Sequence, residues 1–223
     1  MDQNGVWEKI FSTRDWGKYP GEPLIKFVAK NFYKTERSKI KFLEIGSGPG
    51  ANIWFLTREG FQVDGIECSP SAIMQTYKRL EDESLTLKGN IIEEDVRNIW
   101  KMSDKYDGII DNECICCLNR HDAELAYSHI AKLLKPNGHL FVRTFANGTY
   151  GESSGKKIDD RTWECAVGPM ANMGQTRFCH KSDFATLFKD ELYEIEHCEL
   201  ISETIDNMQK TVNEWVLYLR PKS

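Results

Sequence analysis

The chain has 223 residues, 40% hydrophobic and 28% charged, which is enough for one α/β domain with a full core. It has no run of about 18 apolar residues for a membrane span, and its acidic, polar start lacks the basic region of a secretory signal. The net charge of -5 argues against a nucleic-acid partner, and the seven cysteines show no disulfide spacing. We therefore expect a cytoplasmic protein, a monomer or homodimer, that acts on a small molecule.

Residues 1–38 are expected to form a helical cap, because aromatic and turn-forming residues precede apolar residues at helical spacing over 24–32. Short apolar runs then alternate with helical patterns. Strands are predicted over residues 40–46, 61–67, 90–94, 106–111 and 139–145. Helices are predicted over residues 51–59, 70–80 and 122–134. Repeated strand–helix units of this length indicate a parallel sheet that is covered on both faces.

The C-terminal part breaks this alternation. A polar, turn-rich stretch over 146–180 is long for a loop, and such a stretch is typical of a lid or substrate-binding segment. A short helix over 182–188 precedes two β-rich runs, 192–201 and 211–219, which predict an antiparallel hairpin. The expected architecture is a single domain with three α/β/α layers around a seven-stranded, mostly parallel sheet.

The strongest local signal is the turn between the first predicted strand and its helix, Gly46-Ser47-Gly48-Pro49-Gly50. Glycines let the backbone turn tightly and approach a ligand closely, and the following helix points its first amides at that ligand. About twenty residues further on, Glu67 ends the second strand, where a carboxylate can accept both hydroxyls of a ribose. The combination favours a nucleoside-containing ligand over a plain turn beside a solvated carboxylate.

The identity of that nucleoside ligand depends on two further acids. Gly46, Gly48 and Ala51 also fit a relaxed dinucleotide pattern. However, Glu44 lies inside an otherwise apolar strand, and a buried carboxylate needs hydrogen-bond partners or a nearby cation. Asp95 follows the third strand, where an acid can accept from the exocyclic amine of adenine. Asn90 is the alternative residue for that position, and we prefer Asp95.

These features resemble the class I S-adenosylmethionine-dependent methyltransferases, with their Rossmann-like fold and reversed last strand. The resemblance implies that Glu44, Gly46, Ser47, Gly48 and Asn52 hold the methionine part of the cofactor S-adenosylmethionine. It implies that the ribose lies against Glu67, Cys68 and Ser69, and the adenine against Asp95 and Val96. It also implies that Asp111-Asn112, at the end of the fourth strand, lies beside the methyl group.

The acceptor side is less defined by the sequence. Methyl transfer from a sulfonium is an in-line displacement, so the protein mainly aligns the two reactants. A hydroxyl acceptor also loses a proton, and Asp111, Glu113, His121 and His180 are candidate bases. Arg143, Tyr150, Arg177 and His180 are candidates for recognising an anionic or hydroxylated acceptor. The alternative is that the arginines pair with the many acids of the domain.

No metal site is expected. The fifth predicted strand ends in Arg143-Thr144-Phe145 without a carboxylate, which argues against magnesium. Cys114, Cys116 and Cys117 are interpreted as buried apolar residues rather than as ligands of zinc or arsenite.

The aromatic cap, the run over 50–54 and the segment over 176–178 resemble small bacterial methyltransferases of sugar, capsule and lipopolysaccharide pathways. We therefore hypothesise a sugar, nucleotide-sugar or other phosphorylated metabolite as acceptor. The alternatives are another small amine or carboxylate, a protein substrate, an NAD-dependent reductase and a non-catalytic S-adenosylmethionine-binding protein.

Overall fold

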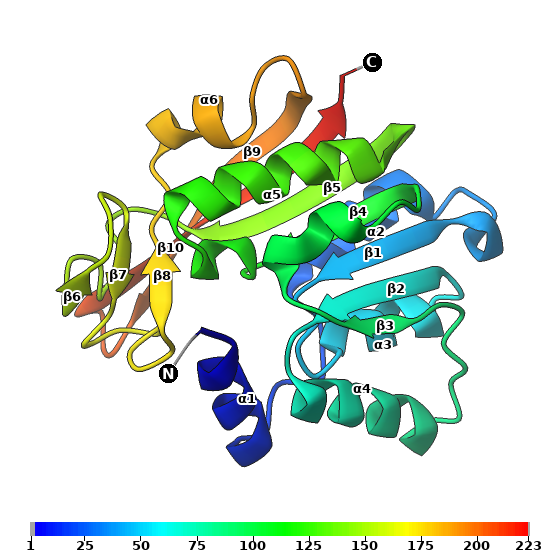
Figure 1. The fold of residues 1–223 in the computed structure, drawn as a ribbon, viewed down its shortest axis with the longest axis horizontal. Helices are drawn as coiled ribbons and strands as arrows, with labels where there is room; N and C mark the ends of the chain where they lie inside the picture. The colour runs from blue at the N-terminus through cyan, green and yellow to red at the C-terminus, as the bar shows by residue number, and fades with distance from the viewer. Residues whose placement is uncertain (1–2, 223) are drawn as a thin grey trace.

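One seven-stranded sheet runs through the middle of the molecule, in a computed structural model that describes residues 3–222 (Figure 1). Its strand order is β3-β2-β1-β4-β5-β10-β9. The strands are β1 (Lys41–Ile45), β2 (Gln62–Glu67), β3 (Ile91–Glu93), β4 (Tyr106–Asn112), β5 (Leu134–Phe145), β9 (Tyr193–Ile205) and β10 (Lys210–Pro221). The first five pair in parallel, whereas β10 runs antiparallel to both β5 and β9. The predicted mostly parallel sheet with a C-terminal antiparallel hairpin is confirmed.

Helices cover both faces of this sheet, because successive side chains of each strand point to opposite faces. Phe42 and Ile110 pack on one face with α2 (Glu22–Phe32), α3 (Ala51–Arg58) and Leu80 of α4 (Pro70–Asp82). Leu43 and Ile109 pack on the other face against α5 (Arg120–Leu133), α6 (Phe184–Leu187) and the 3-10 helix η2 (Val96–Lys101). The remaining short 3-10 helices are η1 (Arg37–Lys39), η3 (Ile115–Cys117) and η4 (Lys181–Asp183). The three-layer α/β/α arrangement is therefore as predicted.

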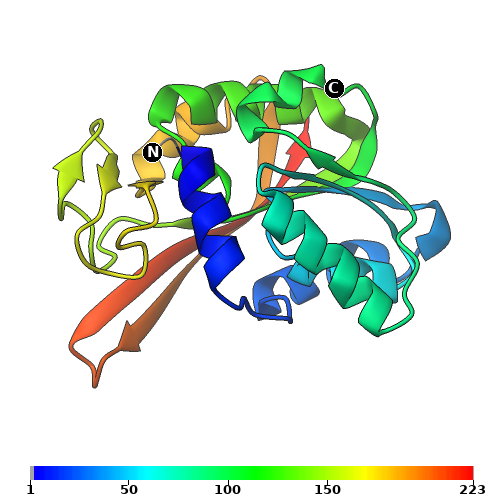
Figure 2. The same cartoon turned by 60° about the horizontal axis from the view of Figure 1, so that its bottom comes forward.

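The segment over 146–180 has structure of its own that the sequence did not predict. It carries a second, three-stranded antiparallel sheet of β6 (Lys156–Lys157), β7 (Thr162–Glu164) and β8 (Gln175–Arg177). The N-terminal helix α1 (Gln3–Thr13) lies between this small sheet and α4 (Figure 2). The first two residues of the predicted cap, and the last residue of the chain, lie outside the described residues. In residues 3–222, no helix is long and apolar enough to cross a membrane.

The β5 strand begins earlier than predicted. Leu134 already pairs with Tyr106, whereas the next paired residue of β4, Gly108, pairs with His139. The residues between them, 135–138, therefore bulge out of the ladder. The sequence Pro136-Asn137-Gly138 thus forms an irregularity within the strand.

Candidate functional site

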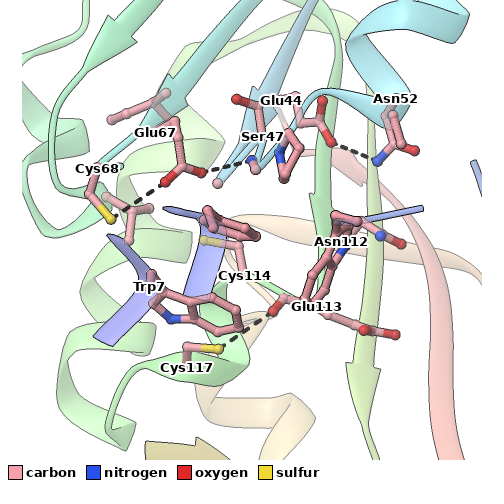
Figure 3. Close-up of a pocket in the computed structure, with 18 of the residues that line it drawn as sticks. Trp7, Glu44, Ser47, Asn52, Glu67, Cys68, Asn112, Glu113, Cys114 and Cys117 are labelled. Carbon is pink, nitrogen blue, oxygen red and sulfur yellow. Dashed lines mark hydrogen bonds between the residues drawn. The ribbon is translucent and has the colours of Figure 1, made fainter. Parts of the chain in front are cut away.

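A cavity of about 420 Å³ opens at the carboxyl ends of β1, β2 and β4, and α1 forms part of its wall (Figure 3). We distinguish two sides of it. The glycine-loop side consists of the lining residues within 44–52, 66–68 and 94–97. The aromatic side consists of the lining residues within 3–21, 112–118 and 170–175, together with Arg143. This location matches the rule that ligands of open α/β sheets bind beyond the carboxyl ends of the strands.

The glycine turn after β1 is shaped by close packing. Gly46 has a φ of +62°, and a Cβ atom there would lie 2.3 Å from the Sγ of Cys114. Gly50 has a φ of +77°, and its Cβ would lie 2.3 Å from a methyl carbon of Thr76. Only glycine combines this left-handed backbone with so little space. The turn therefore stays close to η3 and α4, and its residues line the cavity.

Glu44 is buried on β1 at the floor of the cavity, with 2% of its surface exposed. The Nδ2 of Asn52 donates to its Oε1 at 2.6 Å, and its Oε2 has no partner. Burial raises the pKa of this carboxyl to about 8. A buried, half-satisfied carboxylate favours a cation beside it. This is the environment that the amino group of the methionine part of S-adenosylmethionine requires.

Glu67 ends β2 on the same side of the cavity. Gly48 N donates to its Oε2 at 2.7 Å, and Ser69 N donates to its Oε1 at 2.9 Å. Burial raises its pKa, and these amide hydrogen bonds oppose that shift. Each carboxylate oxygen can accept a second hydrogen bond, so both retain capacity for a ribose hydroxyl. The residues present fit the ribose of a nucleoside.

Asp95 follows β3 and caps η2, where it accepts from the backbone amide of Arg97 at 2.8 Å. It also accepts from the Nδ2 of Asn4 at 2.7 Å, a contact that joins α1 to the glycine-loop side. Val96 lines the cavity beside it. The alternative residue, Asn90, directly precedes β3, so it lies at the amino end of that strand and does not line the cavity. Its backbone amide donates to Asp64 Oδ1 at 2.9 Å.

The aromatic side faces these acids. Trp7 and Phe11 of α1 stack with their ring centroids 5.4 Å apart, and the edge of Trp16 packs against both rings. Met170 and Met173 add thioether surface near them. In Figure 3, Trp7 and Cys117 lie across the cavity from Glu67 and Ser47. This wall suits a flat or apolar molecular face.

Polar groups interrupt the aromatic side where β4 and β5 end. Glu113 has a φ of +64°, and its Oε1 lies 3.1 Å from the Nε of Arg143. The same guanidinium donates from its Nη2 to Glu214 of β10 at 2.6 Å. Burial raises the pKa of Glu113 to about 8, and a hydrogen bond with Glu214 adds to that shift against the opposing charge of Arg143.

Most of the residues predicted for the donor come together at the cavity, and two do not. The lining residues are Glu44, Gly46, Ser47, Gly48, Asn52, Glu67, Cys68, Asp95 and Val96. Ser69 does not line it, because its hydroxyl caps α4 and bonds to Glu8 of α1. Asp111 is fully buried and faces α5, where it accepts from Tyr127 Oη at 2.6 Å and from the amides of η3. Asp111 therefore does not line the cavity, whereas the adjacent Asn112 does.

The predicted acceptor residues lie mostly outside the cavity. Arg143 lines it, whereas His121 is exposed on the first turn of α5. His180 lies 3.5 Å from Glu152 and caps η4. Lys210 lies over the ring of Tyr150, and Arg177 is 1% exposed in the protein interior. His121, Tyr150, Arg177 and His180 do not line the cavity.

Several lining residues were missed from the sequence. They are Gln3, Asn4, Trp7, Phe11, Trp16, Tyr19, Cys114, Cys117, Leu118, Met170, Met173 and Gln175. Asn112 ends β4, and Glu113, the candidate base named from the sequence, follows it; both line the cavity. Cys114, Cys117 and Leu118 lie in or beside η3, whereas the others are brought in by tertiary packing of residues 3–19 and of the segment over 146–180, for which the sequence carries no short motif.

Comparisons with known proteins agree with this geometry. The profile of a family described as a methyltransferase domain matches residues 16–210. The malonyl-[acyl-carrier protein] O-methyltransferase of Priestia megaterium is 29% identical over 140 residues, which cover 62% of this chain and 47% of that protein. The chain thus spans about half the length of this curated relative.

Solved structures share the fold. Magnesium protoporphyrin IX methyltransferase of Synechocystis PCC 6803 superposes with a TM-score of 0.70 at 15% identity, over 100% of both chains. A S-adenosylmethionine-dependent methyltransferase of Methanosarcina mazei superposes with a TM-score of 0.70 at 16% identity, over 90% of this chain and 97% of that one. At such low identity the likeness concerns the fold and carries no residue roles.

Proposed function

This chain belongs to the methyltransferase-domain family. We propose that it uses S-adenosylmethionine as its methyl donor and methylates a small molecule bound on the aromatic side of the cavity. One observation carries the proposal. The unpaired Oε2 of Glu44, the carboxylate of Glu67 and the start of η2 line the same cavity as the Trp7–Phe11 wall. A donor and an acceptor can therefore meet without an intermediate carrier.

The residues of the chain bind and orient rather than react with the donor. When bound, S-adenosylmethionine supplies an electrophilic methyl group on a sulfonium. Glu44 holds the amino group of its methionine part, and Glu67 holds the ribose. Asp95 and the Val96 amide hold the adenine, for which Asp95 exchanges its contact with Asn4. The stacked rings of α1 exclude water from the acceptor and align it.

The sequence suggests a sugar, a nucleotide-sugar or another phosphorylated metabolite as acceptor. The charges in the cavity favour the uncharged members of that group. Arg143 is the one predicted anion-binding residue that lines the cavity, and two carboxylates already pair with it. A sugar face stacked on Trp7 is compatible with the aromatic side. A cytoplasmic location and a monomeric or homodimeric state stay predictions.

The test is binding followed by an acceptor screen. Titration calorimetry is expected to give micromolar binding of S-adenosylmethionine and S-adenosylhomocysteine and no binding of NADH. S-adenosylhomocysteine release is then measured with sugars, phosphorylated sugars, amines, carboxylates and protein extracts. Binding of NADH alone would overturn the donor assignment. Turnover of protein acceptors with none of the small molecules would overturn the acceptor class.

A further inference from the structure

Three charged side chains from three strands meet at the floor of the aromatic side. Glu113 follows β4, Arg143 belongs to β5 and Glu214 belongs to β10. The guanidinium contacts Glu113 Oε1 at 3.1 Å through Nε, and Glu214 Oε2 at 3.1 Å through Nε and 2.6 Å through Nη2. Glu113 and Arg143 line the cavity, whereas Glu214 lies behind them. One cation thus serves two carboxylates, and only one of the two is reachable by a ligand.

The backbone of Glu113 is held in an unfavourable conformation. A non-glycine residue at φ +64° is strained, and such strain persists only where its surroundings enforce it. Here the Glu113 amide donates to Arg143 O at 2.9 Å, and its carbonyl accepts from the thiols of Cys116 and Cys117. These contacts fix the carboxylate against Arg143 at the cavity wall. Residues at such strained positions cluster at functional sites.

We propose that Glu113 is the base that removes the proton of the acceptor, and that the site takes a hydroxyl or amine nucleophile rather than an anionic group. This inference rests on the proposed function. As the acceptor oxygen or nitrogen attacks, its new bond to the methyl carbon forms while the carbon–sulfur bond breaks. The electron pair of the broken bond goes to sulfur and leaves neutral S-adenosylhomocysteine. The proton goes to a carboxylate oxygen of Glu113 and then to solvent through the cavity.

The charge of the lining excludes an anionic acceptor. Among the described residues that line the cavity, five are carboxylic acids (Glu44, Glu67, Glu94, Asp95 and Glu113) and two are arginines (Arg97 and Arg143). Arg97 pairs with Asp95, and Arg143 pairs with Glu113 and Glu214. A phosphate or carboxylate bound there would have to displace a glutamate from its arginine. A neutral hydroxyl or a neutral amine avoids this cost.

The surroundings of Glu113 also tune its proton affinity. Burial raises its pKa to about 8, and Glu214 and Asp111 add to the shift, whereas Arg143 opposes it. The neighbouring Cys117 is a protonated thiol, because its pKa is raised well above the usual value by a hydrogen bond with Cys116 and by burial. A carboxyl group whose pKa lies near the working pH is an efficient general base in its ionised form.

The first test needs no acceptor molecule. Infrared difference spectra of the wild-type protein, recorded between about pH 5 and 9, report protonated carboxyl groups directly. We expect a carboxyl band that disappears as the pH rises through about 8 and that is diminished in Glu113→Gln. The exposed Glu164→Gln is the matched control and should leave the band unchanged. Because burial also raises the pKa of Glu44 to about 8, the Glu44→Gln variant identifies the part of the carboxyl band that comes from Glu44. A Glu113 that stays protonated throughout this range cannot accept a proton, and that result overturns the proposal.

The second test uses the first acceptor found to release S-adenosylhomocysteine in a panel of sugars, phenols and amines, each paired with a phosphorylated counterpart. Glu113→Gln should lower kcat about 10²–10⁴-fold and abolish the rise of activity with pH, while S-adenosylmethionine affinity stays within about two-fold. Glu113→Asp should recover part of kcat. Glu214→Gln should keep a pH-dependent activity but move its midpoint. An unchanged kcat in Glu113→Gln, or a preference for the phosphorylated counterparts, overturns the inference.

Failure of the proposed function has a different signature. It appears as a wild-type protein that binds no S-adenosylmethionine in calorimetry. If the wild type binds the donor and Glu113 proves dispensable, only the assignment of the base and of the acceptor class is lost. Thermal melting of each variant distinguishes loss of the base from loss of folding.

Discussion

The glycine-loop side of the cavity is built from segments that follow one another closely in the chain, whereas the aromatic side is assembled from distant ones. Glu44, Gly46 and Glu67 belong to one strand–turn–helix–strand unit, and their positions follow from its geometry. Trp7, Glu113 and Met173 come from three separate parts of the chain and meet only through tertiary packing. Local geometry therefore determines the side proposed to bind the donor, and tertiary packing determines the side proposed to bind the acceptor.

The largest expected effect tests how rigid the glycine-loop side is. Gly46→Ala places a Cβ 2.3 Å from the Sγ of Cys114 on a left-handed backbone, so the turn or η3 has to move. We expect S-adenosylmethionine affinity to fall about 100-fold or more, with a loss of stability of about 2 kcal/mol. Calorimetry and thermal melting measure the two effects. Gly17→Ala is the control, because no heavy atom lies within 4 Å of its added Cβ. Tight binding by Gly46→Ala would show that this side adapts as readily as the aromatic side.

Glu67→Ala tests the same side through a single ligand contact. The substitution removes the acceptor of the Gly48 and Ser69 amides and of the ribose hydroxyls. The affinity for S-adenosylmethionine should fall by about 1–3 kcal/mol, because these are charge-assisted hydrogen bonds. Glu93→Ala is the matched control, since Glu93 lies next to Glu67 in the sheet and is exposed. Equal affinities of the two variants would place the ribose elsewhere.

The pH dependence of stability tests the buried acid at the floor. Burial raises the pKa of Glu44 to about 8 from its usual 4.5, so the folded protein binds this proton more tightly than the unfolded chain. The contribution of this protonated carboxyl to the free energy of unfolding is fully present below about pH 4.5, and it is lost as the pH rises through about 8. Glu44→Gln should flatten the fall of the melting temperature over this range, and Glu164→Gln should not. An unchanged slope in Glu44→Gln would mean that the carboxyl is ionised in the free protein.

The smallest expected effect concerns the attachment of α1. Glu8 accepts hydrogen bonds from Ser69 and Ser71 at the start of α4, and they lower its pKa. Glu8→Ala should weaken S-adenosylmethionine binding about two- to five-fold and shift the tryptophan emission of the aromatic side, because Trp7 lies on the same helix. Glu22→Ala, an exposed residue of α2, serves as control. A larger loss than that of Glu67→Ala would make α1 part of the donor site.

The two sides also differ in what could be predicted from sequence. The sheet, its hairpin and the acids Glu44, Glu67 and Asp95 follow from strand periodicity and from spacing along one βαβ unit. The burial of Asp111 was not predicted, because the alternation of a strand decides which face a residue occupies, and here that face is covered by α5. The burial of Arg177 was not predicted for a different reason, since a polar residue in a turn-rich segment gives no sign of burial. The strained backbone of Glu113 has no sequence signature.

The helix α1 is attached to both sides at once. Asn4 bonds to Asp95, whereas Gln3 bonds to the carbonyl of Met173 at 3.3 Å and accepts from the Gln175 amide at 3.1 Å. An adenine that takes over Asp95 thus releases the attachment at Asn4, while the preceding residue, Gln3, still bonds to the segment over 146–180. Thermodynamic linkage makes such coupling reciprocal, so whatever factor the donor imposes on acceptor affinity, the acceptor imposes on donor affinity.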